Sequence, residues 1–161
     1  MPRLVACGGR EAAFDDFCTA HRGAAGHFVA MLVDSEEPVA DGERPWAHLH
    51  ARDQWEKPHG AVDEQALLMI TCMEAWIACD RSALRERFGE QFQATALPAL
   101  RGLESTGRAD LLRGLEHATR HCQVRYEKSR VSFEILGLVS PDVLSALPGF
   151  ARVLRILEER L

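Results

Sequence analysis

Two acidic residues follow an apolar segment in the first quarter of the chain. Residues 27–33 are almost all apolar, and Asp34 and Glu36 come after them. Because the two acids are two positions apart, an extended backbone places their side chains on the same face. Paired carboxylates at the end of a strand suit a hard divalent cation such as Mg²⁺ or Mn²⁺, which prefers oxygen ligands. The alternative interpretation is a solvated turn in which these acids cap backbone amides.

A third acidic residue, Glu74, lies alone in a long apolar segment. The thirteen other residues from Ala66 to Cys79 carry no charge. An ionised carboxylate is costly in such surroundings unless it is paired, hydrogen-bonded or bound to a metal. The sequence therefore leaves two interpretations open, a buried ion pair with an arginine and a metal ligand. If the strand before Glu74 lies beside the strand that ends at Asp34, Asp34, Glu36 and Glu74 form one cluster suited to two-metal phosphoryl chemistry.

Positive charge concentrates later in the chain, around Arg125, Lys128 and Arg130. Basic side chains near an acidic metal site would neutralise phosphate charge in a transition state. A solvated charged face is the other interpretation of the same residues. His117 and His121 lie four residues apart on a predicted helix, and we expect them to be a surface pair rather than metal ligands.

An α/β arrangement would place these side chains together. Residues 3–7 and 27–34 are predicted to be strands, and residues 10–21 between them are predicted to be an amphipathic helix. This order fits one right-handed β-α-β crossover. A further strand is predicted from residue 66 to about residue 73. Sites in open α/β sheets form beyond the carboxyl ends of the strands, which is where the acidic residues are expected.

The rest of the chain is predicted to be a long excursion followed by helices. Residues 35–62 are rich in proline, glycine and charge, and Trp46 and Trp55 are expected to pack this irregular segment onto the body of the protein. We therefore predict a single α/β domain over residues 1–161, with a small parallel sheet, flanking helices and a helical C-terminal part. The helices predicted in that part are residues 81–88 capped by Asp80, 108–122, 132–138, a helix opening at 141, and 148–161.

Composition restricts the function classes. The 161 residues are 47% hydrophobic and 27% charged, which is typical of a soluble globular protein. The 19 basic and 24 acidic residues give a net charge of −5, which argues against coating nucleic acid by bulk charge but not against a local basic patch. The sequence has no apolar run long enough for a membrane span and no signal peptide, so a cytoplasmic location without membrane association is expected. Phosphate-binding loop, dinucleotide-binding and nucleophile-elbow motifs are missing, which gives little support to nucleotide binding or serine hydrolase activity.

Three motifs carry a resemblance to a known family. The segments LVDSEEP at 32–38, CMEAW at 72–76 and KSRVSF at 128–133 resemble an uncharacterised bacterial family, domain-of-unknown-function family 4276. That family looks like a divergent Toprim fold, related to the nuclease part of overcoming-lysogenization-defect proteins. Its members are often encoded beside an ATPase, which implies a role in defence against phages or mobile elements.

The resemblance implies a role for each candidate residue. Asp34 and Glu36 match the acidic pair of a Toprim metal site, and Glu74 is a third acidic member. Lys128 and Arg130 match the basic element near the scissile phosphate. Relatives carry a strand and a glutamate upstream of the stretch that matches residues 2–9, which implies either that the start codon of this chain is placed late or that a catalytic glutamate is missing.

Two functions are therefore expected from the sequence. The first is a Toprim-like nuclease or phosphoryl-transfer protein that depends on Mg²⁺ or Mn²⁺, acts on DNA or RNA and works with a partner ATPase in defence. The second is a catalytically inactive Toprim-like module that binds a partner protein or assembles with itself.

Overall fold

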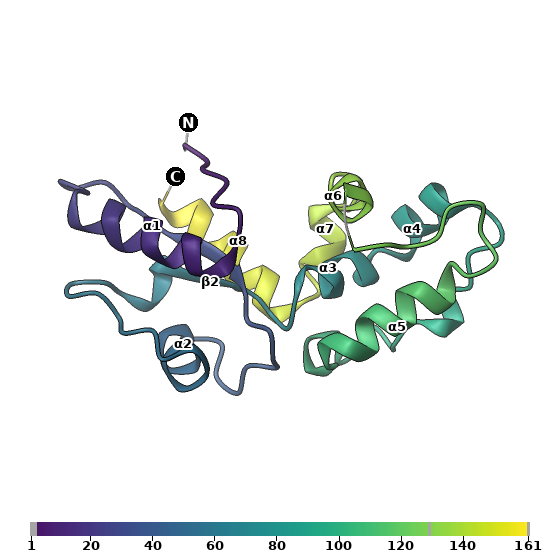
Figure 1. Ribbon diagram of the computed structural model, residues 1–161, viewed down its shortest axis with the longest axis horizontal. Coiled ribbons are helices and arrows are strands. Elements are labelled where there is room, and N and C mark those ends of the chain that lie inside the picture. Colours follow the sequence, from purple (N-terminus) through teal and green to yellow (C-terminus); the bar gives the residue numbers. More distant parts are fainter. Residues whose placement is uncertain (1–2, 129, 161) are drawn as a thin grey trace.

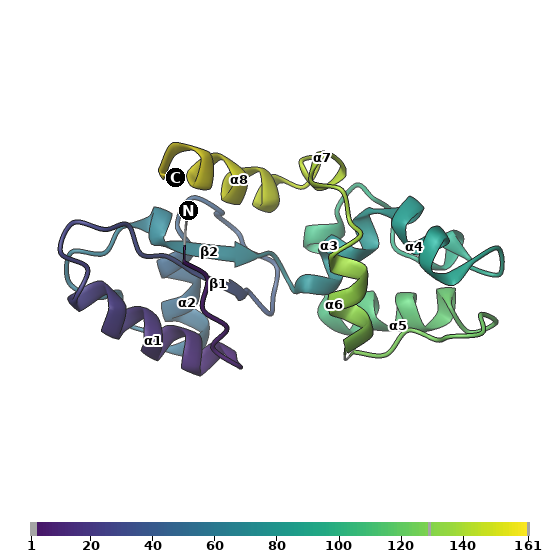
Figure 2. The ribbon, with the colours of Figure 1, turned by 90° about the horizontal axis from the view of Figure 1, so that it is seen from above.

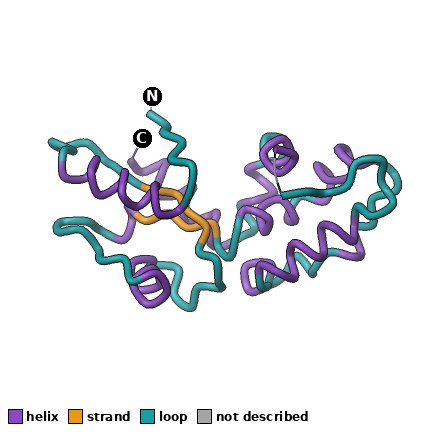
Figure 3. The backbone as a smooth tube through the Cα atoms, in the orientation of Figure 1, coloured by secondary structure: helices purple, strands orange, loops and turns teal. Residues whose placement is uncertain are grey.

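The computed structural model describes residues 3–128 and 130–160, which form two halves joined end to end (Figure 1). The first, here called the sheet half, contains both strands, and the second, the helical half, contains helices and loops (Figure 3). The sheet half comprises β1 (Met31–Asp34), β2 (Ala66–Met69), α1 (Arg10–Arg22), α2 (Pro45–Asp53) and α8 (Pro148–Arg160). The helical half comprises α3 (Met73–Cys79), α4 (Arg81–Phe88), α5 (Arg108–Ala118), α6 (Arg130–Leu136) and α7 (Pro141–Leu144).

The sheet of the described chain consists of β1 and β2 in parallel. Met31 lies opposite Ala66, and Asp34 lies opposite Met69. The carboxyl ends of both strands therefore lie side by side at one end of the sheet, here called the carboxyl edge. Helices cover both faces, with α1 and α8 on opposite sides of the sheet (Figure 2). Both strands are almost entirely apolar because most of their side chains are covered, and only Leu32 of β1 is exposed, at 44%. The residues that pack α1 and α2 onto one face include Phe17, Met31, Val33, Trp46, Leu49 and Leu68, and those that pack α8 onto the other are Leu67, Val153 and Ile156.

The helical half has its own apolar core around α3. Ala75, Ile77 and Ala78 of this helix are fully buried. Asp80 ends α3 and caps α4, because its Oδ1 accepts hydrogen bonds from the backbone N–H groups of Ser82 and Ala83. This confirms the predicted cap. In the described ranges, no helix combines the length and apolar character that crossing a membrane requires.

The predicted N-terminal strand is wrong. Residues 3–7 lie outside the sheet, and the side chains of Leu4 and Val5 are 91% and 61% exposed. The predicted crossover through residues 10–21 is therefore replaced by a parallel pair whose connection contains α2. A strand needs a partner strand and a surface to pack on, and an apolar pattern alone supplies neither. The strand predicted at 27–34 starts only at Met31 because its partner β2 starts opposite that residue.

The excursion at residues 35–62 is less irregular than predicted. It contains α2, which begins at Pro45, a residue that favours the first turn of a helix. Trp46 and Trp55 are 4% and 5% exposed, which confirms that the segment packs onto the body of the protein. The predicted C-terminal helices are also present, with shifts of a few residues at their ends.

Candidate active site

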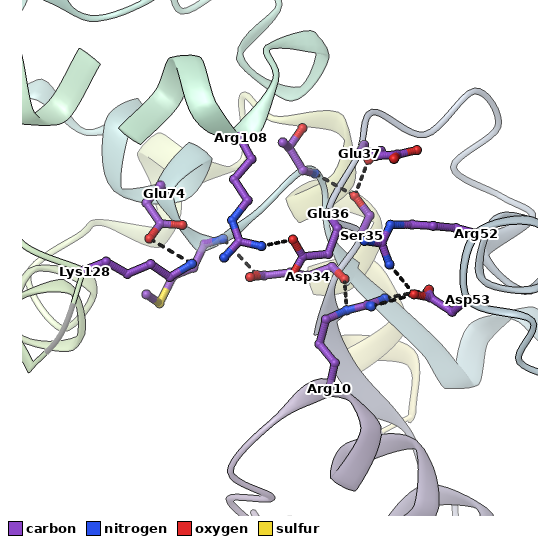
Figure 4. Close-up of polar contacts among 12 residues, drawn as sticks. Arg10, Asp34, Ser35, Glu36, Glu37, Arg52, Asp53, Glu74, Arg108 and Lys128 are labelled. Carbon is purple, nitrogen blue, oxygen red and sulfur yellow. Dashed lines mark hydrogen bonds and ion pairs between the residues drawn. The ribbon is translucent and has the colours of Figure 1, made fainter. Parts of the chain in front are cut away.

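The carboxyl ends of β1 and β2 meet the helical half, and the candidate acids lie at this junction. Asp34 is the last residue of β1, and Glu74 lies in the first turn of α3, shortly after β2. Arg108 and Lys128 reach the same edge from the helical half (Figure 4). The parallel pairing of the strands thus brings together residues that are far apart in the sequence.

Strained backbone links the ends of the two strands. The N–H of Glu36 donates to the carbonyl of Thr71 at 2.7 Å, and the N–H of Thr71 donates to Oγ of the buried Ser35 at 2.7 Å. Glu36 and Thr71 have φ angles of +66° and +64°, in the left-handed region. This conformation is rare for a β-branched residue such as threonine. Such strain clusters at functional sites, where the surrounding structure holds it in place.

Asp34 is a half-buried carboxylate with a raised pKa. Its Oδ1 accepts a hydrogen bond from the N–H of Met73 at 2.9 Å, and its backbone carbonyl accepts one from Nε of Arg10 at 2.9 Å. Burial raises the pKa of Asp34 and the negative charge of Glu74 adds to the effect, while the bond from Met73 and the charges of Lys128 and Arg108 act against it. A cation placed between Asp34 and Glu74 would favour the ionised form of Asp34.

Glu36 forms an ion pair across the junction. Its Oε2 accepts a hydrogen bond from Nη1 of Arg108, the first residue of α5. The side chain of Glu36 is 15% exposed, whereas that of Arg108 is 36% exposed. Glu36 is therefore the candidate acid that an arginine neutralises, and Arg108 ties the helical half to the sheet half.

Glu74 is fully buried and only half satisfied. Its Oε1 accepts a hydrogen bond from the hydroxyl of Tyr126 at 3.1 Å and lies 3.5 Å from Nζ of Lys128. Its Oε2 is buried and has no hydrogen-bond partner among the described residues. The side chain of Lys128 is 40% exposed, so its ammonium group faces both the carboxylate and solvent. The buried ion pair that the sequence left open thus exists, with a lysine in place of an arginine.

The groups around Glu74 stay protonated at neutral pH. Burial and, after it, the negative charge of Glu74 raise the pKa of the neighbouring Cys72 thiol to about 12. Burial likewise raises the pKa of Tyr126, whose hydroxyl also bonds Oγ of Ser132 at 3.0 Å. A protonated thiol is a poor nucleophile and metal ligand. The chemistry of this edge therefore depends on its carboxylates and cations.

The three predicted acids do not form one tight cluster. In residues 3–128 and 130–160, no group of three or more histidine, cysteine, aspartate or glutamate side chains is placed to hold one metal ion. Mg²⁺ in phosphoryl-transfer sites is usually held by one or two carboxylates together with water and substrate phosphates. Asp34 and the unpartnered Oε2 of Glu74 fit that smaller requirement. Glu36 is not available as a metal ligand while its carboxylate is bound to Arg108.

Of the two basic residues predicted near the scissile phosphate, Lys128 and Arg130, the structure places the side chain of Lys128. Lys128 lies at the carboxylate of Glu74. Arg130 is the first residue of α6, and its side chain lies outside the described part of the chain. The role predicted for Arg130 stays a prediction.

Sequence reasoning missed the residues that hold the edge in place. Arg10 donates through both Nη atoms to the carboxylate of Asp53 at 2.9 Å and stacks over the ring of Trp55. The Arg10 guanidinium holds the pKa of Asp53 below its ordinary value. Together with the bond from Arg10 to the carbonyl of Asp34, these contacts fix α1 and α2 to the end of β1. These partners are 24 and 43 residues from Arg10, so no local spacing could indicate them.

Comparison with known families identifies the chain at the level of the family. Residues 10–158 match the family described as Domain of unknown function (DUF4276), and the chain belongs to this family. The matched range contains all the candidate site residues. Comparison with curated proteins and with solved structures gives no match.

Proposed function

We propose that this chain is a Toprim-like phosphoryl-transfer protein that depends on Mg²⁺ or Mn²⁺, and that it cleaves DNA or RNA. The observation that carries the proposal is the buried Oε2 of Glu74, which has no hydrogen-bond partner in the described chain, together with Asp34, whose pKa is raised by burial and by the negative charge of Glu74. A buried carboxylate oxygen without a partner is costly. A divalent cation shared by Asp34 and Glu74 would satisfy both carboxylates.

In this proposal, Asp34 and Glu74 hold the cation, which when bound polarises a phosphoryl oxygen. Arg108 and Lys128, which reach the junction from the helical half (Figure 4), stabilise the negative charge of the phosphate. Arg108 has the planar fork that binds two phosphate oxygens at once, whereas Lys128 supplies a compact charge. Arg130, two positions after Lys128, is proposed as a third cation.

A phosphate bound at Arg108 would also change the state of Glu36. Arg108 cannot keep its full set of donors on Glu36 while it binds phosphate oxygens. Glu36 would then be released toward Asp34, two residues away, and would complete the predicted acidic set. Glu36 would thus add a third carboxylate to a cation that Asp34 and Glu74 already hold without substrate.

The Toprim-like assignment and the wider biological role are part of the proposal. A parallel sheet covered by helices on both faces, with acids after both strands, supports the Toprim-like assignment. A partner ATPase and a role in defence rest on the family resemblance. They are tested by purification of the tagged chain from its host cells, with an ATPase expected among the proteins that copurify.

The experiment is a cleavage assay on supercoiled plasmid DNA and on single-stranded RNA, with Mg²⁺ or Mn²⁺ added and with EDTA as the metal-free control. Lys128→Met is expected to reduce cleavage by roughly 10²-fold or more, and Glu74→Gln is expected to abolish it. The chain has two lysines, so Lys57→Met is the matched control, and its exposed side chain lies far from the junction. Cleavage that survives EDTA or Glu74→Gln would overturn the proposal.

A second candidate function is a non-catalytic module that assembles with a partner protein. One observation favours it: Glu36 and Glu74 each have a cationic partner within the chain, so the junction is partly neutralised without any metal. This function predicts a stable complex with the partner ATPase or with a second copy, and no response to divalent ions. Light scattering tests for the complex, and calorimetric titration of Mn²⁺ distinguishes the two functions, because only the metal-dependent function predicts binding of the ion.

A further inference from the structure

A groove of about 370 Å³ lies beside β2, between the loop before α2 and the start of α8. Its volume falls within the range of about 300–1,000 Å³ that is usual for ligand sites. The loop before α2 forms one wall, the start of α8 forms the other, and the end of β2 lies between them. The lining residues include Val39, Glu43, Leu68, Ile70, Glu104 and Arg152.

The floor of the groove carries backbone groups that face away from β1. The carbonyls of Met69 and Thr71 point toward β1, because they accept hydrogen bonds from Ser35 and Glu36. Successive residues of a strand direct their backbone groups to opposite edges. The backbone groups of Leu68 therefore point outward, into the groove. The carbonyl of Ala66 confirms this alternation, because it accepts a hydrogen bond from Arg152 on the outer side.

Arg152 places a buried, incompletely used cation on the wall of this groove. Its side chain is 8% exposed, and its two Nη atoms donate to the carbonyls of Ala66 and Asp63 at 3.3 and 2.9 Å. Its Nε has no hydrogen-bond partner among the residues described. The carboxylate of Glu43 lies 3.5 Å from Nε, but the side chain of Glu43 is 70% exposed and also reaches Arg155 at 3.4 Å. Glu43 is thus a loosely held and replaceable partner for a buried guanidinium group.

The start of α8, on the same wall as Arg152, is held close to β2. Both carboxylate oxygens of Glu104 accept a hydrogen bond from the N–H of Gly149 at 3.0 Å. A Cβ atom at Gly149 would lie 2.4 Å from Cγ1 of Ile70, so only glycine allows α8 to start this close to the strand. The groove therefore has a mainly apolar floor and one cationic donor, Nε of Arg152, that has no hydrogen-bond partner among the described residues. These properties suit a single extended chain rather than a bulky ligand.

We propose that this groove binds an extended segment of a partner protein, which adds to β2 as a third strand and places an acidic side chain at Arg152 in place of Glu43. The main chain of the segment would bond the outward backbone groups of Leu68, as in other cases of strand addition. Apolar side chains of the segment would pack against Val39, Leu68 and Ile70. The residues involved differ from those of the metal-dependent site, so this inference stands whether or not the chain is an enzyme.

The probe is the blocked pentapeptide acetyl-Thr-Val-Thr-Val-Glu-amide, titrated into the full chain and followed by calorimetry. Two control peptides test the two parts of the proposal. One carries glutamine in place of glutamate, and the other has an N-methyl group on the central threonine, which blocks strand pairing. Both controls are expected to bind at least about tenfold more weakly, because each loses a hydrogen-bonded contact and leaves a group of the groove unpaired.

The protein variant that tests the role of Glu43 is Glu43→Gln. Removing this competing carboxylate should tighten binding of the probe by roughly two- to fivefold, the effect of one exposed ion pair. The matched control is Glu159→Gln, which removes the same charge from a residue that pairs with Arg155 on α8 away from the groove. It should leave binding unchanged.

Three results would overturn the inference. The first is no binding of the probe to either the wild-type chain or Glu43→Gln. The second is equal binding of the N-methylated peptide, which would mean that no strand is added. The third is displacement of the probe by acetate at a concentration similar to that of the probe, which would mean a simple anion site. Glu43 is exposed, so its substitution leaves folding intact and keeps each of these outcomes informative.

Discussion

Replacing Glu74 by methionine is expected to make the protein more stable. The substitution keeps the volume of the side chain and removes a buried charge whose Oε2 has no hydrogen-bond partner in the described residues. Tyr126 keeps a partner after the change, because its hydroxyl also bonds Oγ of Ser132. Lys128 is 40% exposed and can be solvated once its partner is removed. A residue that is retained for function at a cost in stability is expected to give a more stable protein when it is replaced.

The size of the effect follows from these contacts. Leaving a buried acceptor unpaired costs about 1–3 kcal/mol, and more when it is charged. The ion pair with the partly exposed Lys128 contributes only about 0–1 kcal/mol. Well-packed apolar replacements of buried ion pairs range from neutral to about 4 kcal/mol stabilising. We therefore expect Glu74→Met to raise the free energy of unfolding by about 1–2 kcal/mol, which for a chain of this length is roughly 2–8 °C in Tm.

The assay is urea unfolding followed by circular dichroism near neutral pH, without divalent ions. Ile77→Ala, at a fully buried position of the same helix, is the control, and it should lower the free energy of unfolding by about 2–5 kcal/mol. A loss of about 3–5 kcal/mol in Glu74→Met would refute the reasoning. It would show that Glu74 and Lys128 are a structural ion pair.

The remaining predictions concern two other carboxylates. Burial raises the pKa of Asp34 in the folded state above its ordinary value of 3.8. The folded state therefore loses stability as the pH rises from 3.8 through the raised pKa, because Asp34 must ionise while buried. Asp34→Asn should therefore be more stable than the wild type near pH 7 and equally stable near pH 2, as measured by urea unfolding at both pH values. Arg10 lowers the pKa of Asp53, so the ionised Asp53 stabilises the fold. This stabilisation is present above pH 3.8, the ordinary pKa, and is lost as the pH falls through the lowered pKa. Asp53→Asn should cost about 1–2 kcal/mol near pH 7 and nothing at a pH below the lowered value, and an equal loss at both would contradict the ion-pair explanation.

The candidate acids could be predicted from the sequence because local patterns mark them. Asp34 and Glu36 follow an apolar strand, and Glu74 is the one charge in an apolar segment. The family motifs at the same positions agree with this pattern. The parallel pairing of β1 and β2 then brings these positions to the same end of the sheet, but the three side chains form no metal-binding cluster in the described residues.

The partners of these acids could not be predicted, because their contacts join distant parts of the chain. Arg108 is 72 residues from Glu36, and Tyr126 is 52 residues from Glu74. Nothing in the local sequence distinguishes Arg108 from the other arginines, which greatly outnumber the lysines. Pairing of this kind depends on how the helical half docks onto the sheet half.

The fold was predicted best where local signals and tertiary packing agree. Asp80 caps α4 as its sequence position indicates, because capping needs only neighbouring backbone groups. Residues 3–7 have the apolar pattern of a strand, but pairing depends on a neighbouring strand that the pattern does not specify. The helix that begins at Pro45 could not be predicted because proline usually interrupts a helix. At the first turn, however, proline favours a helix.

The most direct test of the proposed site is calorimetric titration of Mn²⁺ into the wild-type chain, Asp34→Asn and Glu74→Gln, with circular dichroism to verify folding. The proposed function predicts that the wild-type chain binds Mn²⁺ and that either substitution removes the binding, since Asp34 and Glu74 hold the ion together. Glu90→Gln, which removes a carboxylate at an exposed position of the helical half, should bind like the wild type. Wild-type protein that binds no Mn²⁺, or Asp34→Asn and Glu74→Gln variants that bind it equally well, would contradict the proposed metal site.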